Sequence, residues 1–449
     1  MKKITLFLLM ATVFIHSLIA QSDKQRIDSL VNAYYENAEF NGTLLVARSG
    51  QIILNKGYGF SDVGNKILNS DKTVFNIASI TKTFTAALIL KLQEEGKLSV
   101  NDQLSKYYPD YPNGDKITIH QLLTHTAGVT DYVQDPGFQS SDQSKAVTLQ
   151  NMIDLFKDKP LSFEPGTKFR YSNSGYTLLG YIIEKLTGTS YADALQQYIF
   201  RTLRMKHTTF GPPADTTNLA KGYMMYFKNF KRSSLPVHAT VSYATGAIYS
   251  TVNDLNIWHR SLQSGKFLSA KSLKSSYLRD KGNYGFGWFT DTLYGKPRVS
   301  HDGNISGFKS NINRFPADDI CVIALSNSNN SAVGGMVRNI VNIVYDQPFS
   351  KSIADQPVID MSDSLKAIFA GVYRFGEAKN AQVSVDLVDK NLLLTIPGID
   401  PMKLDPITGN VFRSGPARVE FWGPAKGQFT QIRVYNKGEF FGAQKVTRE

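Results

Sequence analysis

Cysteine is almost absent from this chain, since Cys321 is the only one in 449 residues. A single cysteine cannot form an intramolecular disulfide, so the fold must depend on a large buried core, which a chain of this length can form. Cys321 lies in an apolar run, residues 320–325, and this setting predicts an inert core thiol rather than a nucleophile.

Long hydrophobic runs are also missing, with one exception at the N-terminus. Residues 4–20 are largely apolar, follow two lysines and end in Ala20 before polar residues, which is the pattern of a cleaved secretory signal. We therefore expect residues 1–20 to be removed and the chain to be exported, to the periplasm or out of the cell. An uncleaved membrane anchor is the alternative, and the small residue at the end of the run argues against it. No later stretch is long and apolar enough to predict a transmembrane helix.

Acidic residues are fewer than basic ones, 38 against 50, and the formal net charge is +12. The basic residues are scattered along the chain. Their densest patch, residues 228–232, has no nucleic-acid-binding motif beside it, and we interpret it as a solvated loop. We therefore expect no nucleic-acid partner.

Several catalytic signatures are lacking as well. The chain has no Gly-x-Ser-x-Gly nucleophile elbow and no glycine loop that would bind a phosphate. His120 and His125 are spaced five apart, which does not align them on one helical face, and no carboxylate completes a metal-ligand set with them. We therefore expect neither a metal nor an organic cofactor.

What the chain does contain is a hydroxyl and an amine at the start of an apolar helix. Ser79 and Lys82 are three residues apart, a spacing that places both side chains on one helical face. A serine hydroxyl needs a base within reach to act as a nucleophile, and burial lowers the pKa of an amine towards the range where it can accept a proton. The run from Thr83 to Leu92 is apolar nearly all round, which predicts a central, buried helix. The alternatives, a capping serine and a surface lysine, do not explain why the two occur together.

Two further motifs follow in order, Tyr-Ser-Asn at 171–173 and His-Asp-Gly at 301–303. The first supplies the phenol of Tyr171 and the amide of Asn173, and the second the imidazole of His301. Alternative interpretations are a core tyrosine, a turn asparagine and a polar histidine at a sheet edge. Asp302 should point away from the cleft because side chains alternate along a strand.

Each motif alone could arise by chance. Ser306 and Lys309 repeat the Ser-x-x-Lys spacing, but at the start of a predicted strand, where such positions point to opposite faces. Tyr-x-Asn also recurs, at 35–37 and 111–113, whereas His-x-Gly occurs once. The order, spacing and local context of the three motifs therefore carry the specificity.

With these motifs the chain resembles the serine β-lactamase and penicillin-binding protein superfamily, in the branch that has a tyrosine in the second motif and His-x-Gly in the third. This branch includes class C β-lactamases, D-Ala-D-Ala carboxypeptidases, D-aminopeptidases and esterases. Segments 119–128 and 163–166 also resemble framework segments of this superfamily. The resemblance implies that Ser79 forms an acyl-enzyme and that Lys82 and Tyr171 share the base role, with the division between them open.

Substrate contacts follow from the same resemblance. Asn173 would orient the lysine and the substrate amide, and His301 would face the substrate. Backbone N–H groups of Ser79 and Asn304 would hold the oxyanion. Gly303, lacking a side chain, would let the backbone approach the acyl group closely.

The absence of Lys-Thr-Gly in the third motif affects the expected substrate. Without that ammonium, binding of a substrate carboxylate is weakened, so a peptidase or esterase is favoured over an efficient β-lactamase. We expect a small-molecule or peptide substrate, which could derive from peptidoglycan. The alternative is an inactive or weakly active envelope module that binds muropeptides or a partner protein.

The order of predicted elements indicates an α+β fold. Strands at both ends of residues 21–347, with helices between, predict an antiparallel sheet beside a helical region, as in a β-lactamase-like domain. Residues 348–363 are polar and contain two prolines, which predicts a linker. Alternating residues and frequent turns over 364–449 predict a small all-β domain.

Overall fold

The computed structural model describes most of the chain, with short gaps. The described residues are 23–36, 39–226, 229–232, 236–329, 332–350, 356–374, 382–398, 400–414, 417–423, 429–436 and 439–446. The predicted signal peptide, residues 1–20, lies outside them, as do residues 351–355 of the predicted linker. Both remain predictions.

The chain divides into two compact units. The first is built from Asn41–Met224 and Arg232–Asn329, and the second from Ser22–Phe40, Met225–Lys231 and Asn330–Glu449. All three sequence motifs lie in the first unit.

A six-stranded antiparallel sheet forms one layer of the first unit, in the order β10-β11-β12-β13-β1-β2. The strands are β1 (Gly42–Arg48), β2 (Gln51–Tyr58), β10 (Phe289–Leu293), β11 (Lys296–Ile305), β12 (Phe308–Phe315) and β13 (Ile320–Ser326). Strand β1 pairs with β13, from Gly42 opposite Ser326 to Arg48 opposite Ile320. The sheet therefore joins the two ends of the predicted domain, and the predicted fold class is confirmed.

Strands β1 and β2 form an antiparallel hairpin. Ser49 and Gly50 have φ angles of 49° and 76°. Two successive positive φ angles are typical of a type I′ turn, whose twist matches that of the flanking strands.

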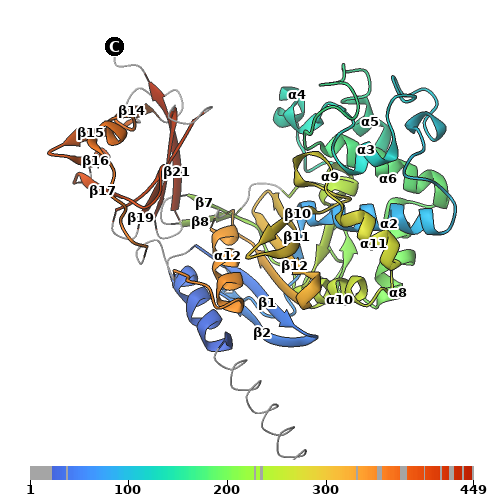
Figure 1. Ribbon diagram of the computed structural model, residues 1–449, viewed down its shortest axis with the longest axis horizontal. Coiled ribbons are helices and arrows are strands. Elements are labelled where there is room, and N and C mark those ends of the chain that lie inside the picture. The colour runs from blue at the N-terminus through green and yellow to red at the C-terminus, as the bar shows by residue number, and fades with distance from the viewer. Residues whose placement is uncertain are drawn as a thin grey trace, which may run out of the picture. The chain divides into compact units, whose positions relative to one another are not determined.

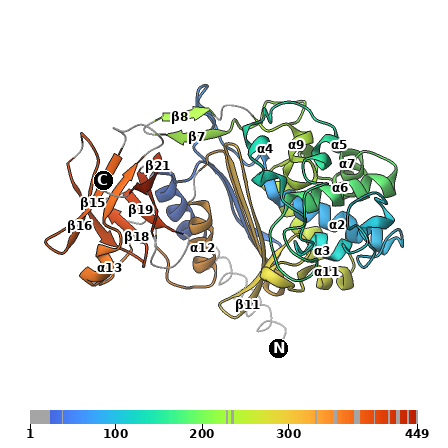
Figure 2. The ribbon, with the colours of Figure 1, turned by 90° about the horizontal axis from the view of Figure 1, so that it is seen from above.

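Most of the regular structure of the first unit between β2 and β10 is helical. They are α2 (Thr81–Glu94), α3 (Ile119–Leu123), α4 (Pro136–Ser140), α5 (Leu149–Asp154), α6 (Asn173–Thr187), α7 (Tyr191–Leu195), α8 (Arg201–Leu203), α9 (Ala239–Gly246), α10 (Val252–Gln263) and α11 (Ala270–Tyr277). Figures 1 and 2 show α2, α6 and α9 together on one face of the sheet. Single turns of 3-10 helix are η1 (Ala78–Ile80), η2 (Leu104–Lys106), η3 (Tyr132–Gln134), η5 (Lys281–Asn283) and η6 (Pro316–Asp318), and η4 (Gln196–Phe200) is π-helical.

Short strands complete this part of the chain. They are β3 (Phe60–Asp62), β4 (Ile67–Leu68), β5 (Phe75–Asn76), β6 (Thr209–Phe210), β7 (Tyr223–Tyr226), β8 (Asn229–Arg232) and β9 (Ile248–Ser250). Strands β7 and β8 form a two-stranded sheet. The basic patch was therefore wrongly predicted as a loop, because pairing with the strand before it gives four of its residues an extended conformation.

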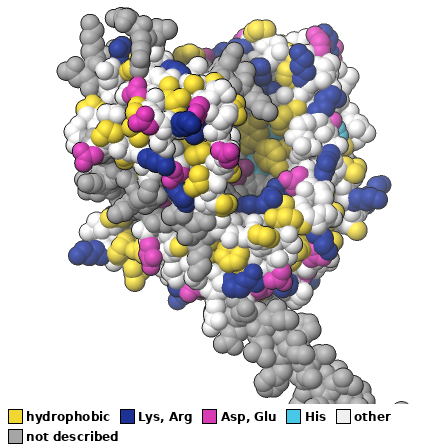
Figure 3. Space-filling view, turned by 60° about the vertical axis from the view of Figure 1, so that its left-hand side comes forward, with side chains coloured by type: hydrophobic (Ala, Val, Ile, Leu, Met, Phe, Trp, Pro, Cys, Tyr) yellow, Lys and Arg dark blue, Asp and Glu magenta, His cyan; other side chains and the backbone are white. Residues whose placement is uncertain are grey.

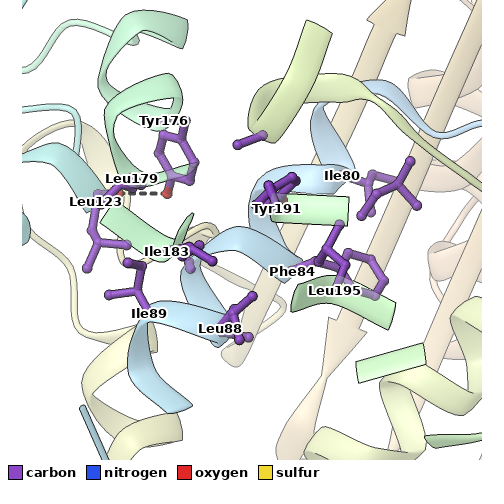
Figure 4. Packing of buried hydrophobic residues seen from close by; sticks show 14 of the residues in the cluster. Ile80, Phe84, Leu88, Ile89, Leu123, Tyr176, Leu179, Ile183, Tyr191 and Leu195 are labelled. Carbon is purple, nitrogen blue, oxygen red and sulfur yellow. Dashed lines mark hydrogen bonds between the residues drawn. The ribbon is translucent and has the colours of Figure 1, made fainter. Parts of the chain in front are cut away.

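Helix α2 lies at the centre of the core, as its apolar sequence predicts. Nearly every side chain from Thr81 to Leu92 is buried. Phe84 stacks on Trp258, with ring centroids 4.4 Å apart, and Figure 4 shows Phe84 and its neighbours packed among residues of the adjoining helices. Because packing on all sides fixes α2, its first turn, which carries Lys82, is held still.

The second unit contains helix 23–36, α12 (Val333–Val344), α13 (Asp363–Ala367) and a closed eight-stranded antiparallel barrel. The barrel strands follow in chain order: β14 (Gly371–Arg374), β15 (Gln382–Val388), β16 (Asn391–Thr395), β17 (Met402–Pro406), β18 (Val411–Ser414), β19 (Ala417–Trp422), β20 (Gln431–Asn436) and β21 (Glu439–Val446). Pairing of β14 with β21 closes the barrel, and rings such as those of Phe369 and Phe421, 4.7 Å apart, pack in its core. The predicted all-β domain is confirmed.

The structure also bears on the single cysteine, on membrane-spanning helices and on metal ligands. Cys321 is completely buried on β13, and burial raises its pKa to about 12. Within the described ranges, no helix has both the length and the hydrophobicity needed to cross a membrane. In the same part of the chain, no group of three or more His, Cys, Asp or Glu side chains is arranged to hold a metal ion.

Candidate active site

Ser79 lies on the 3-10 turn η1, immediately before α2. The helix therefore starts two residues later than expected, because Ala78 has a φ of 47° and interrupts regular helical geometry. The turn is held by two hydrogen bonds to Ile77. Its N–H donates to Ile248 O at 2.9 Å, and its carbonyl accepts from Ser310 Oγ at 2.7 Å. Ser79 is thus presented on a fixed turn.

Lys82 is fully buried, and three acceptors surround its amine. Nζ donates to Ser79 Oγ at 3.1 Å, to Asn173 Oδ1 at 2.9 Å and to the backbone oxygen of Thr245 at 2.9 Å. The first two motifs of the sequence therefore meet at this nitrogen.

Burial changes the protonation of this amine. It lowers the pKa of Lys82 to about 7, although the carboxylates of Asp131 and Asp302 act in the opposite direction. An amine with a pKa near neutrality is present in both protonation states at physiological pH. It can therefore accept a proton from the adjacent hydroxyl.

Asn173 is the first residue of α6, and Asp131 fixes its orientation. The Asn173 backbone N–H donates to Asp131 Oδ1 at 3.0 Å, and its Nδ2 donates to Asp131 Oδ2 at 3.2 Å. Because the amide nitrogen faces the carboxylate, the amide oxygen faces Lys82. Asp131 therefore determines which end of the amide the lysine meets.

Tyr171 lies beside the same pair. Lys82 Nζ is 4.9 Å from the centroid of its ring. Burial raises the pKa of Tyr171 well above its usual value, and a hydrogen bond with Ser79 acts in the opposite direction. The ring of His125, 4.2 Å away between centroids, packs on Tyr171. Tyr171 is therefore a neutral phenol next to the serine and the amine.

His301 is a buried, neutral histidine on β11. Its Nδ1 is 2.6 Å from Asp302 O and its Nε2 is 2.9 Å from Tyr284 OH. A carbonyl only accepts hydrogen bonds, so Nδ1 carries the proton and Nε2 accepts from the tyrosine. Burial lowers the pKa of His301 to about 4, so its ring carries no positive charge at neutral pH.

The third motif borders the cavity along a free strand edge. Strand β10 pairs with residues 296–300 of β11 and stops there, so residues 301–305 have β12 on one side only. His301, Asp302 and Asn304 all line the cavity. Burial alternates along this edge as expected for a strand, with His301 and Gly303 buried and Asp302 exposed. Asp302 nevertheless borders the cavity, which the sequence did not predict.

Gly303 is the point where β11 meets the turn that carries Ser79. A Cβ at this position would lie 2.5 Å from Ile77 O and 2.9 Å from the Cβ of Ala78. The close approach that this glycine permits is therefore to the turn η1, whereas the sequence predicted an approach to the acyl group.

Ser79, Tyr171, Asn173 and His301 line one cavity of about 690 Å³. Apolar side chains on its walls include Val133, Phe138, Val237, Val241 and Phe289. The face drawn in Figure 3 is hollowed, and hydrophobic side chains gather inside the hollow. The arrangement thus combines a nucleophile, a base and a mostly apolar space for a small molecule.

Known proteins are similar to this chain in sequence and in fold. The Beta-lactamase family model matches residues 27–345. The chain belongs to this family. Penicillin-binding protein 4* of Bacillus subtilis (strain 168) is 29% identical over 429 residues, covering 89% of this chain and 94% of its own length.

Solved structures of β-lactamase-like proteins have the same fold. The octameric penicillin-binding protein homologue from Pyrococcus abyssi matches with a TM-score of 0.67 and 22% identity, covering 92% of this chain and 98% of its own. The D-amino acid amidase from Ochrobactrum anthropi SV3 matches with a TM-score of 0.62 and 24% identity, covering 71% of this chain and 99% of its own. The chain is a hydrolase of the serine β-lactamase and penicillin-binding protein superfamily, as the motifs predicted.

Other members of the site were not found from the sequence. Thr245 contributes only its carbonyl, which leaves no signal in residue type. Asp131 lies outside every motif, and Tyr284 is one of 22 tyrosines. His125 was considered only as a metal ligand, although it lies in one of the framework segments. Their roles depend on chain-distant contacts that only the fold brings together.

Proposed function

We propose that this chain is an exported serine hydrolase that cleaves an amide or ester through an acyl-enzyme at Ser79. The observation that carries the proposal is the 3.1 Å contact of Lys82 Nζ with Ser79 Oγ, made by an amine whose pKa burial lowers to about 7. A site that only bound a ligand would not need to keep an amine in this state.

Acylation starts when Lys82 is neutral. Ser79 Oγ forms a bond to the substrate carbonyl carbon while its proton moves to Lys82 Nζ, and the carbonyl electron pair moves to the oxygen. Because the pKa of Tyr171 is raised well above its usual value, its phenol stays protonated and donates rather than acts as the base. Lys82 is therefore our candidate for the base in this step.

The oxyanion is stabilised by backbone N–H groups. Ser79 and Asn304 both line the cavity, on the turn η1 and on the free edge of β11. Their N–H groups are our candidates for the donors. Collapse of the intermediate breaks the bond to the leaving group, which takes the proton through Lys82 or Tyr171, and water then releases the acid from Ser79.

The third motif favours substrates without a carboxylate. His301 is neutral, and its Nε2 accepts from Tyr284, so it offers no ammonium-like partner. Amides and esters without a carboxylate are therefore preferred over β-lactams and D-Ala-D-Ala ends, both of which carry one.

The test is hydrolysis of a panel of nitrophenyl esters, amino-acid amides, D-Ala-D-Ala peptides and nitrocefin by the wild type and by Ser79→Ala. We expect ester or amide turnover that falls by about a thousandfold or more in Ser79→Ala. The matched control is Ser306→Ala, which removes the serine of the second Ser-x-x-Lys. This variant should keep its kcat for hydrolysis, even if its KM changes. Unchanged hydrolysis by Ser79→Ala would refute the proposal.

A further inference from the structure

The charge on the cavity lining, among the described residues, is of one sign. Among the described residues that line it, Asp302 is the only one with an ionisable carboxylate, and none is a lysine or an arginine. Lys82 lies beneath Ser79 and does not line the cavity. A ligand inside it therefore meets negative charge at one place and no permanent positive charge among these residues.

Asp302 lies close to the reacting groups. It is adjacent in sequence to Gly303, which packs against the turn of Ser79 so closely that a Cβ would lie 2.9 Å from Ala78 Cβ. The charge of Asp302 also acts on both Lys82 and His301 and raises the pKa of each. A group bound by this carboxylate therefore lies in the same cavity as the carbonyl that Ser79 attacks.

Apolar side chains lie in the same cavity as this carboxylate. Phe289 and Ile305 line the cavity together with Asp302, and Val241 adds to the apolar surface. Asp302 itself is exposed, so solvent reaches its carboxylate, and the apolar side chains beside it offer contact to a hydrophobic group of the same ligand. The carboxylate attracts a cation and repels an anion.

We propose that Asp302 determines specificity by binding an ammonium group of the substrate near the scissile carbonyl, while the apolar walls accept a hydrophobic group. The inference rests on the proposed function for the carbonyl and deepens it by naming the substrate class: amine-bearing amides or esters. The ammonium belongs either to the acyl part, as in an amino-acid amide, or to the leaving group, as in an ester of an amino alcohol.

Binding to Ser79→Ala protein tests the inference without turnover. Calorimetric titration compares phenylalaninamide, as each enantiomer, with its N-acetyl derivative, which has the same side chain and no charge. A second pair, phenylacetylcholine and 3,3-dimethylbutyl phenylacetate, differs by a charged nitrogen in place of a carbon in the leaving group. We expect the cationic member of one pair to bind about 10- to 100-fold more tightly, and the pair that responds identifies the position of the ammonium.

The same titrations with Ser79→Ala/Asp302→Asn should abolish that preference, because asparagine keeps the shape and removes the charge. Ser79→Ala/Asp302→Glu should retain it. The matched control is Ser79→Ala/Asp318→Asn, since Asp318 lies on η6 and pairs with Lys296 at 3.2 Å. Equal affinities within both pairs, including no measurable binding of any compound, or a preference that survives Asp302→Asn, would overturn the inference. Loss of hydrolysis in Ser79→Ala tests the proposed function separately.

Discussion

The protonation of one buried amine governs the chemistry at the residue scale. Because Lys82 must be neutral to accept the proton of Ser79 and its pKa is about 7, kcat/KM should rise with pH and level off above an apparent pKa near this value. The profile should be measured with a neutral ester, so that titration of the substrate does not contribute. A rate that does not change through this range would contradict the assignment of Lys82 as the base.

Asp131 should tune that profile. Its carboxylate raises the pKa of Lys82, so Asp131→Asn should move the rising limb of the pH profile to lower pH. The oxygen of asparagine can still accept from the backbone N–H of Asn173, but its Nδ2 cannot accept from Asn173 Nδ2, so the plateau of kcat/KM should fall as well. The matched control is Asp142→Asn, because Asp142 is on the surface and does not line the cavity. A limb that stays in place or moves to higher pH would count against this coupling.

Residue patterns predicted the groups that act through side chains in short motifs. Ser79, Lys82, Tyr171 and Asn173 could be found because a helix or a loop start places them at fixed spacings. Thr245 could not be found, since any residue type offers a carbonyl. The place of Asp302 at the cavity could not be predicted either, because it depends on where β10 ends.

At the scale of elements, a kink in α9 places two backbone carbonyl groups within hydrogen-bonding distance of side chains on α2. Tyr243 has φ 35° and ψ −130°, and the residues after it turn their carbonyls towards α2. Ala244 O accepts from Thr85 Oγ1 at 2.7 Å, and Thr245 O accepts from Lys82 Nζ at 2.9 Å. A strained backbone at Tyr243 thus positions an acceptor of the catalytic amine.

Helix α6 supports this kink through Gly180. A Cβ there would lie 2.3 Å from Cε1 of Tyr243 and 2.7 Å from Cβ of Ala244. Gly180→Ala should therefore lower the free energy of unfolding by about 1–3 kcal/mol and reduce kcat by displacing the carbonyl that holds Lys82. Chemical unfolding and steady-state kinetics measure the two effects.

The matched control lies in the same helix. A Cβ at Gly175 would lie 3.6 Å from its nearest atom, which is an ordinary contact. Gly175→Ala should therefore not lower the free energy of unfolding through overpacking. Equal effects of the two substitutions would show that Gly180 has no special part in holding α9.

Elements with strong patterns could be predicted, and short ones could not. The β1–β2 hairpin and strands β11 to β13 follow from alternating or apolar runs and clear turn residues. Strand β10 was missed because its five residues, Phe-Thr-Asp-Thr-Leu, are too few and too polar to show a period. Strand β8 was missed because its basic residues are extended by pairing with β7.

At the scale of the whole molecule, buried neutral histidines make stability depend on pH. Burial lowers the pKa of His259 to about 2 and of His301 to about 4, and that of His125 well below its usual value. Below the usual pKa of 6.5 the unfolded chain binds protons that the folded chain does not, so stability is lost as pH falls. Each histidine contributes about 1.4 kcal/mol per pH unit, and Glu39, whose pKa burial raises to about 7, acts in the opposite sense.

Urea unfolding at a series of pH values between about 7 and 5 measures this dependence. The net slope should be positive, with stability rising as pH rises. His259→Gln, whose amide oxygen can still accept from Arg314 Nε, should reduce the slope by about 1.4 kcal/mol per pH unit. A slope that is unchanged in this variant would show that His259 is not kept neutral by the fold.

Fold class and a separate β-rich C-terminal part could be predicted from the order of elements. Closure of the barrel could not, because alternation along each strand does not reveal that β14 pairs with β21. The division into units also depends on long-range packing: helix 23–36 belongs with Asn330–Glu449, far away in sequence.

The central claim is that Ser79 is an activated nucleophile, and covalent labelling tests it most directly. The full-length protein is exposed to a fluorophosphonate, digested and mapped by mass spectrometry, alongside Ser79→Ala and Lys82→Met. We predict one adduct, on the peptide containing Ser79, that is absent in Ser79→Ala and forms far more slowly in Lys82→Met. An unlabelled Ser79, or labelling that is equally fast without the Lys82 amine, would contradict the account.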